Sequence, residues 1–228
     1  MQFFKDIFYL FFPEVCLTCK SQLLKNENVI CLLCRHDFPY TDFTNVENNQ
    51  LEKQFYGRVQ LKEATALFYF HKKGKIQQLI HELKYKNHQE IGSLLGKWLG
   101  NDLKESNRFK DIDYIISVPL HPKKIKKRGY NQLTKLGESL SETLQIPYLE
   151  NKLLKISITD TQTHKGRLAR WKNVRNLFES NDISFFENKK VLLIDDVVTT
   201  GATLEACSKQ LLKSKNCTVS IAVIAYAE

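Results

Sequence analysis

VLLIDDVVTTGAT, at residues 191–203, is the stretch of this chain that decides its fold. Its first four residues, 191–194, are a continuous apolar run of the kind found in strands that are covered on both faces. Two adjacent carboxylates, Asp195 and Asp196, end the run. A Thr- and Gly-rich segment then leads into a helix expected over residues 203–213. The pattern predicts a buried strand of a parallel sheet with a polar loop at its carboxyl end.

The residue types in this loop suit a ligand that carries hydroxyl and phosphate groups. Carboxylates at the carboxyl end of a strand lie where open α/β sheets bind ligands, and they accept hydrogen bonds from vicinal hydroxyls. Unpaired N–H groups at a helix N-terminus favour a phosphate, and Gly201 lets the backbone fold tightly around it. The alternative is that Asp-Asp merely ends a strand and that the Thr residues cap a helix. The complete ordered string favours the ligand site, and it is not a P-loop.

Along the rest of the chain from about residue 55, apolar runs alternate with segments of helical spacing. We expect strands at residues 64–70, 114–118 and 218–226, and helices at residues 76–83, 89–103 and 130–144. The apolar runs lack strict alternation with polar residues, as strands covered on both faces do. The order therefore predicts an α/β fold with a mostly parallel sheet and helices on both faces.

A second polar loop follows the strand expected at residues 114–118. It begins with Pro119, Leu120 and His121 and continues into a cluster of cations: Lys123, Lys124, Lys126, Lys127 and Arg128. Cations beside a strand end suit a ligand with several negative charges. A solvated basic loop or a nucleic-acid patch is the alternative.

A further basic segment, residues 161–178, contains Trp171. This segment suits either a clamp on nucleic acid, through charge and stacking, or a hood over the phosphate site. The spacing of its residues does not distinguish the clamp from the hood.

Four cysteines near the N-terminus form two C-x-x-C pairs. Cys16 and Cys19 are separated by an eleven-residue gap from Cys31 and Cys34. Two such turns offer four thiolates to one ion, which predicts a closed, structural Zn²⁺ site. Chance burial and redox pairing are the alternatives. His36 is a spare donor nearby, and we expect the two remaining cysteines, Cys207 and Cys217, in the core or without a role.

Composition sets the broader limits. The chain has 228 residues, of which 43% are hydrophobic, and a formal net charge of +9, so it can build a core and favours anionic partners. We expect a cytoplasmic protein, because its cysteine usage does not suit a secreted disulfide scaffold and it lacks a membrane-spanning apolar run. Residues 1–13 show an apolar stripe at helical spacing, typical of a docking helix rather than a secretory signal; a helix on a membrane surface is the alternative.

The chain divides into three expected parts. Residues 1–40 form an N-terminal helix and the four-cysteine module, and the polar residues 41–54 form a connector. Residues 55–228 form the α/β domain.

In order, the chain carries two C-x-x-C pairs, SVPLHP, KKRGYNQ and IDDVVTTGAT. This order resembles the ComF family of late competence proteins (also called GntX-type), which are phosphoribosyltransferase-like. The most telling stretch is RGYNQ at residues 128–132. Lys84-Tyr85 matches a short family motif, and four more positions keep the family's spacing: Gln162, Arg170, Asn173 and Phe178.

The resemblance implies a type I phosphoribosyltransferase-like fold, preceded by a small zinc-ribbon-like module, that binds phosphoribosyl pyrophosphate with Mg²⁺. Asp195 and Asp196 would bind the ribose hydroxyls. The 5′-phosphate would be bound by Val198, Thr199, Thr200, Gly201, Ala202 and Thr203. The pyrophosphate would be bound by Pro119, Leu120, His121 and Arg128.

The resemblance has two departures. Lys126 stands where the family often has Arg, which weakens a bidentate role at that position. The basic segment around residues 164–167 is only loosely matched.

Two functions remain open on this basis. One is a phosphoribosyltransferase with an unidentified acceptor, linked to competence and DNA uptake. The other is a non-enzymatic factor of the DNA-uptake machinery, with a vestigial phosphoribosyl site, that binds single-stranded DNA or another competence protein. No catalytic base can be named, and an oligomer is compatible with either function.

Overall fold

A computed structural model describes residues 12–155, 178–180 and 182–228 of the chain. Most of the apolar start and of the basic segment at residues 161–178 lies outside this range, so both expectations stay predictions. Within the described residues, no helix combines the length and the apolar character that crossing a membrane requires.

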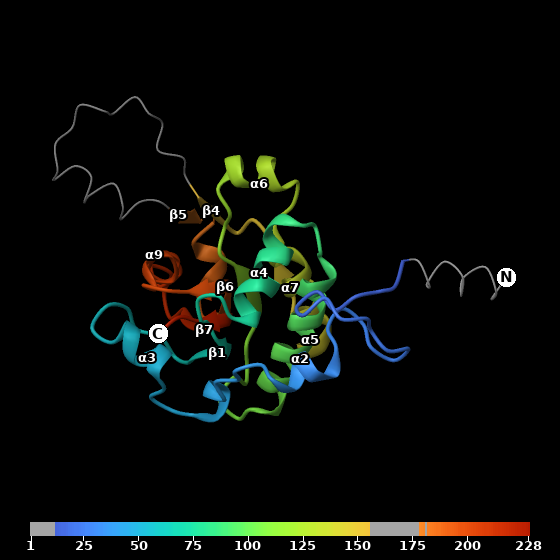
Figure 1. The fold of residues 1–228 in the computed structure, drawn as a ribbon. Coiled ribbons are helices and arrows are strands. Elements are labelled where there is room, and N and C mark those ends of the chain that lie inside the picture. The colour runs from blue at the N-terminus through green and yellow to red at the C-terminus, as the bar shows by residue number, and fades with distance from the viewer. Residues whose placement is uncertain (1–11, 156–177, 181) are drawn as a thin grey trace, which may run out of the picture.

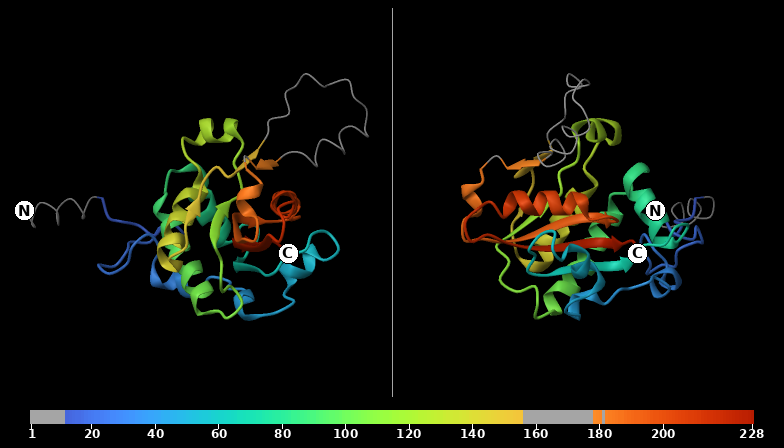
Figure 2. Two further views of the ribbon diagram at one scale, coloured as in Figure 1. Left: turned by 180° about the vertical axis from the view of Figure 1, so that it is seen from behind. Right: turned by 90° about the vertical axis from the view of Figure 1, so that its left-hand side faces the viewer.

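Five strands form one parallel sheet in the order β1-β7-β6-β2-β3. The strands are β1 (Ala64–Tyr69), β2 (Tyr114–Ser117), β3 (Tyr148–Leu149), β6 (Lys190–Val198) and β7 (Thr218–Tyr226). Helix α9 (Ala202–Leu211) lies over one face, and α5 (Glu90–Glu105) and α7 (Gln132–Leu144) lie over the other (Figures 1 and 2). The predicted α/β class, with a parallel sheet and helices on both faces, is confirmed.

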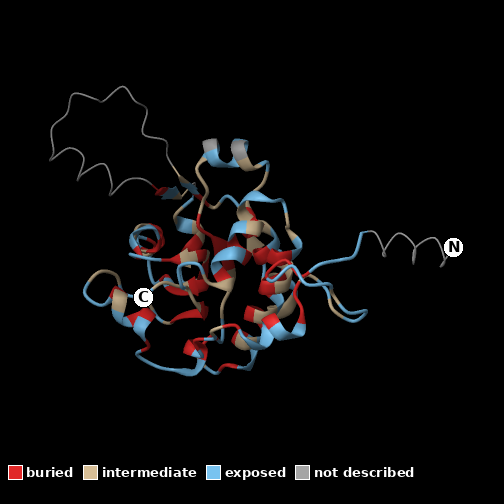
Figure 3. Cartoon of the chain, in the orientation of Figure 1, coloured by how far each residue is buried: buried red, intermediate tan, exposed pale blue. Residues whose placement is uncertain are grey.

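Shorter elements surround this sheet. They are α2 (Leu32–His36), η1 (Phe43–Asn45), α3 (Gln50–Phe55), α4 (Lys75–Tyr85), α6 (Pro122–Arg128) and η3 (Ser184–Phe186), with the antiparallel pair β4 (Leu153–Lys155) and β5 (Phe178–Ser180). The buried residues gather on the central strands and on the inward sides of the helices (Figure 3). In β7 every residue from 219 to 225 is buried, which explains why all of them except Ser220 are apolar.

The strand that carries the two carboxylates is longer than expected. Strand β6 runs on to Val198, so Asp195 and Asp196 lie within it rather than after it. The reason is that β7 keeps pairing past this point, with Asp195 opposite Val223 and Val198 opposite Tyr226.

The expected loop after β2 contains a helix. Helix α6 begins at Pro122, a residue favoured at the first position of a helix because it lacks only an N–H that would be unpaired there. The next helix, α7, begins two residues later than expected because Asn131 caps it: Asn131 Oδ1 accepts a hydrogen bond from the N–H of Leu133 at 3.1 Å.

The polar stretch at residues 41–54 packs against the rest of the fold. Phe43 and Leu51 are buried within it. The Asn49 side chain donates hydrogen bonds to the carbonyl groups of Phe43, Val46 and Ala64 at 3.3, 3.0 and 2.8 Å. The Asn49 side chain therefore pairs with backbone groups instead of facing water, whereas Glu47 and Gln50 in the same stretch are exposed. The division into three domains itself stays a prediction.

The close contact between α5 and α7 depends on glycine. A Cβ atom at Gly96 would lie 2.8 Å from the carbonyl oxygen of Leu136 and 2.8 Å from Ser139 Cβ. At Gly92, one turn earlier, it would lie no closer than 3.1 Å, to the side chain of Lys135.

We predict that Gly96→Ala lowers the free energy of unfolding by about 1–3 kcal/mol, because the added methyl group must push two helices apart. This loss outweighs the higher helix propensity of Ala, worth about 1 kcal/mol. Urea denaturation measures the change, with Gly92→Ala as the matched control. Equal stability of the two variants would contradict the packing argument.

Candidate functional site

The carboxyl ends of β2 and β6 lie side by side. Ser117, the last residue of β2, pairs with Ile194, so the loop that begins at residue 119 emerges next to Asp195. The N–H of Val118 extends this pairing by donating to the Ile194 carbonyl group at 2.9 Å. The register thus brings both predicted ligand loops, residues 119–128 and 195–203, to one edge of the sheet.

Asp196 is 6% exposed and has partners for both of its carboxylate oxygens. Lys84 Nζ lies 2.7 Å from Oδ1, and Gln132 Nε2 donates to Oδ2 at 2.8 Å. Lys84 lies in the last turn of α4 and Gln132 begins α7, so this carboxylate links two helices to β6. Each oxygen keeps a second lone pair with which it can accept a hydrogen bond from a ligand.

Arg128 extends this network to the helix after β2. Its Nη1 donates to Gln132 Oε1 at 2.6 Å, and its guanidinium lies 5.1 Å from the centre of the Tyr85 ring. The hydroxyl of Tyr130 donates to the carbonyl oxygen of Leu83. The motif at residues 128–132 therefore packs against the motif Lys84-Tyr85, and the positive charge of Arg128 is held at the expected pyrophosphate loop.

Asp195 has a different environment. Its side chain is half-buried, and its Oδ1 accepts a hydrogen bond from the N–H of Asp196 at 2.8 Å. Burial, and then the nearby Asp196 carboxylate, raise the pKa of Asp195 to about 8. A bound cation or a donor hydroxyl would favour its charged form again. Asp195 can therefore respond to a ligand, whereas Asp196 is already paired.

The turn after β6 leads directly into the N-terminus of α9. Thr199 and Thr200 are exposed, and Gly201 has a φ of +70° and caps the N-terminus of α9. This left-handed conformation favours glycine. Ala202 and Thr203 form the exposed first turn of α9, and Val198 is buried beneath the turn.

The predicted pyrophosphate residues lie at the same edge. Pro119, Leu120 and His121 are half-buried, and the carbonyl group of His121 accepts hydrogen bonds from the N–H groups of Lys124 and Ile125 at 2.8 and 3.2 Å. His121 is thereby fixed to the start of α6.

The sequence analysis assigned no role to Lys84 or Gln132, although both lie close to Asp196. The only sequence signal for them was their place in the motifs Lys84-Tyr85 and RGYNQ.

The four cysteine thiols of the N-terminal module form a cluster. The sulfur atoms of Cys16, Cys19, Cys31 and Cys34 all lie within 4.8 Å of one another. All but Cys19 are buried, and a hydrogen bond with the Ser21 hydroxyl lowers the pKa of Cys19 to about 6. The geometry allows all four to coordinate one metal ion.

Two ion pairs join this module to α4. Lys20 Nζ lies 2.8 Å from Glu82, and Lys75 Nζ lies 2.7 Å from Asp37. Cys207 and Cys217 are buried elsewhere in the core. His36 is exposed and is not one of the clustered donors.

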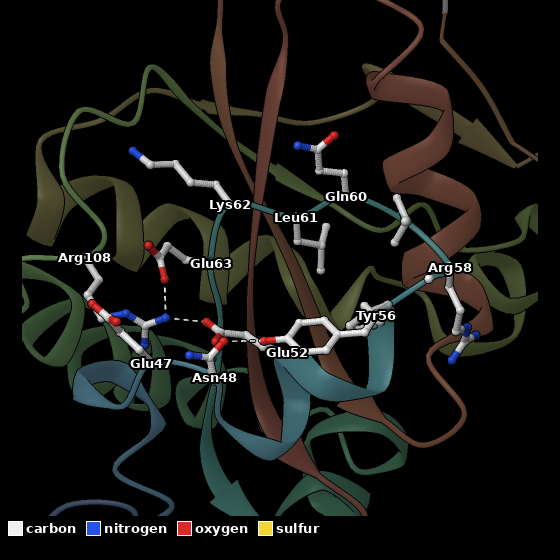
Figure 4. Close-up of a pocket in the computed structure, with 13 residues that line it drawn as sticks. Glu47, Asn48, Glu52, Tyr56, Arg58, Gln60, Leu61, Lys62, Glu63 and Arg108 are labelled. Carbon is white, nitrogen blue, oxygen red and sulfur yellow. Dashed lines mark hydrogen bonds and ion pairs between the residues drawn. The ribbon is translucent and has the colours of Figure 1, made fainter.

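A cavity of about 690 Å³ lies elsewhere, between α3 and the loop of residues 56–63 (Figure 4). Its charged groups pair with one another: Arg108 forms ion pairs with Glu52 and Glu63. The hydroxyl of Tyr56 donates to Asn48 Oδ1 at 2.6 Å. None of the residues that line it belongs to the 195–203 stretch. The candidate site is therefore the edge at the ends of β2 and β6.

Comparison with known proteins identifies chains that are similar to this one. A phosphoribosyl transferase domain model matches residues 133–228. Competence protein F of Haemophilus influenzae is 32% identical over 213 residues, which cover 89% of this chain and 93% of that protein. DNA utilization protein YhgH of Shigella flexneri is 30% identical and covers 64% of this chain and 65% of its own length. The solved structure of glutamine phosphoribosylpyrophosphate amidotransferase from B. subtilis, complexed with ADP and GMP, covers 63% of this chain and 30% of its own, at 19% identity and a TM-score of 0.44.

We predict that Lys84→Met lowers the free energy of unfolding by about 3 kcal/mol, because it leaves the buried Asp196 carboxylate without its cation. The matched control is Lys86→Met, which removes an exposed charge two residues away and should cost about 0.5 kcal/mol or less. Urea denaturation of both variants at neutral pH provides the comparison. If both variants were as stable as the native chain, the ion pair would have no structural role.

Proposed function

Because the chain belongs to the ComF family of competence proteins with a phosphoribosyltransferase-like domain, we propose that it binds phosphoribosyl pyrophosphate with Mg²⁺ and transfers the phosphoribosyl group to an acceptor. One observation carries the proposal: Asp195, Asp196 and the turn at Gly201 lie beside the segment that follows β2 and ends at Arg128. Carboxylates for hydroxyl groups, backbone N–H groups for a phosphate and a cation for a diphosphate all lie along one edge of the sheet.

Each part of this ligand has a place at that edge. The ribose hydroxyls would donate hydrogen bonds to Asp195 and Asp196, and the 5′-phosphate would accept hydrogen bonds in the turn of residues 198–203. The pyrophosphate would lie at residues 119–121 and Arg128. Bound Mg²⁺ would neutralise part of the charge on the pyrophosphate.

These residues also suit the reaction. Breaking the bond between the anomeric carbon and the pyrophosphate oxygen leaves positive charge on the ribose ring. The carboxylates of Asp195 and Asp196, held beside the ribose, would stabilise that charge. Arg128 would stabilise the departing pyrophosphate, and its stacking on Tyr85 and hydrogen bond to Gln132 keep it in place. We place this reaction in the handling of DNA taken up during competence.

A second candidate function rests on the surface of α6. Lys124 and Lys126 are exposed there, beside the proposed pyrophosphate loop, in a chain of net charge +9. A basic helix of this kind suits the phosphate backbone of single-stranded DNA. In this alternative the nucleotide site would be vestigial.

We predict that phosphoribosyl pyrophosphate with Mg²⁺ raises the melting temperature by a few degrees. A ligand present at about a hundred times its dissociation constant stabilises the folded state by about 2.7 kcal/mol. Asp195→Asn should abolish the shift, whereas Asp111→Asn, an exposed carboxylate before β2, should retain it. Absence of a shift in the native protein would refute the proposed ligand and favour the DNA-binding candidate.

We also propose that the four-cysteine cluster holds one structural Zn²⁺, because four thiolates complete its tetrahedral coordination. Elemental analysis should find one zinc per chain in the native protein and in Cys217→Ser, and a strong loss in Cys16→Ser. The Cys16→Ser variant should also melt at a lower temperature, because the ion links two short turns with little core of their own. A zinc content that does not depend on Cys16 would contradict this assignment.

A further inference from the structure

Helix α3 and the turn that follows it hold the turn at Thr199–Gly201 from behind. Gln54 Nε2 donates to the carbonyl group of Thr199, and Arg58 Nη1 donates to that of Thr200 at 2.9 Å. The ring of Phe55 packs under Gly201, where a Cβ atom would lie 2.9 Å from the ring. Three side chains from one segment thus support three consecutive backbone positions.

Arg58 is itself fixed in place. Its Nε and Nη2 donate to Glu205 Oε2 at 2.9 and 2.6 Å, and its Nη1 also donates to the carbonyl group of Gln54 at 3.2 Å. Glu205 lies in the first turn of α9, so the guanidinium joins α3, the turn and the helix that the turn begins. Because these hydrogen bonds already fix the plane of the guanidinium, its hydrogen bond to the Thr200 carbonyl group costs little further side-chain entropy.

The consequence for a ligand follows from peptide geometry. In a planar trans peptide, the carbonyl group of one residue and the N–H of the next point in opposite directions. The carbonyl groups of Thr199 and Thr200 point toward α3, so the N–H groups of Thr200 and Gly201 point away from it. Within the part of the chain that the structure describes, neither N–H donates a hydrogen bond to another group.

We propose that Gln54 and Arg58 are positioning residues that aim the N–H groups of Thr200 and Gly201 at the 5′-phosphate of the ligand. This inference rests on the proposed function for the identity of the ligand. The two side chains do not contact the ligand. Their hydrogen bonds to the carbonyl groups order the turn before the phosphate binds, so the entropic cost of ordering it is not paid on binding.

The test compares two fragments of the ligand. Arg58→Met should weaken binding of ribose 5-phosphate about tenfold, the loss expected for one charge-assisted hydrogen bond, and should leave binding of Mg²⁺-pyrophosphate unchanged. Arg58→Lys, which keeps a donor, should recover part of the loss. Lys53→Met, which removes an exposed charge from α3, the helix just before Arg58, should bind both fragments like the native chain. Isothermal titration calorimetry measures each affinity.

Hydrogen–deuterium exchange provides an independent measurement on the free protein. Arg58→Met should accelerate exchange in a peptide that spans residues 199–203, and Lys53→Met should not. Native affinity for ribose 5-phosphate in Arg58→Met, or unchanged exchange in that peptide, would overturn the positioning role. If the native chain bound neither fragment, the proposed function would fail, and the exchange rates alone would decide whether Arg58 orders the turn. If Arg58→Met failed to fold, Arg58→Lys would replace it in both measurements.

Discussion

The buried carboxylate of Asp196 is the constraint on which the rest of the site depends. A charged group at 6% exposure is costly unless a cation and hydrogen-bond donors accompany it. Lys84 and Gln132 meet that requirement from two different helices, so α4 and α7 must keep fixed positions relative to β6. Gln132 also accepts a hydrogen bond from Arg128. The position of Asp196 therefore also constrains α6, the helix that follows β2.

Much of this support lies outside the part of the chain that the phosphoribosyl transferase domain model matches, residues 133–228. Lys84, Arg128 and Gln132 all precede it, and so does the α3 segment that holds the turn at Gly201. Helix α4 also carries the two ion pairs to the four-cysteine module. The groups proposed to bind the ribose and its 5′-phosphate, residues 195–203, are thus local in sequence, whereas the groups that hold them come from earlier segments.

This difference explains how much could be predicted from the sequence. The α/β class could be predicted because strands covered on both faces leave largely apolar runs without strict alternation, as in β7. Asp195, Asp196 and the turn at Gly201 were accessible because they are consecutive. Lys84 lies 112 residues from Asp196, and Gln132 lies 64 residues from it. The short motif Lys84-Tyr85 marks this lysine, but no local pattern shows that Asp196 is its partner, because tertiary packing alone brings the pair together.

Two features were not predicted, for the same reason. Sequence shows the polarity of residues 41–54 but not which backbone groups the Asn49 side chain satisfies. Strand β6 was predicted to end at residue 194 because carboxylates are rare inside strands. Pairing with β7 on one side extends it to Val198, and Lys84 and Gln132 compensate the charge of Asp196.

The sheet order has a consequence for the synthesis of this protein. Strand β1 pairs only with β7 in the described sheet, Ala64 lying opposite Ile221, and β7 also separates β1 from β6. A nascent chain therefore exposes the β7-facing edge of β1 until the residues of β7 have been synthesised. Such distant pairing slows folding and prolongs the exposure of an unpaired strand edge. The opposite edge of β1 has a local partner, because Tyr40 forms an antiparallel bridge with Phe68. Ribosome stalling before residue 218 would thus leave β1 with one edge unpaired.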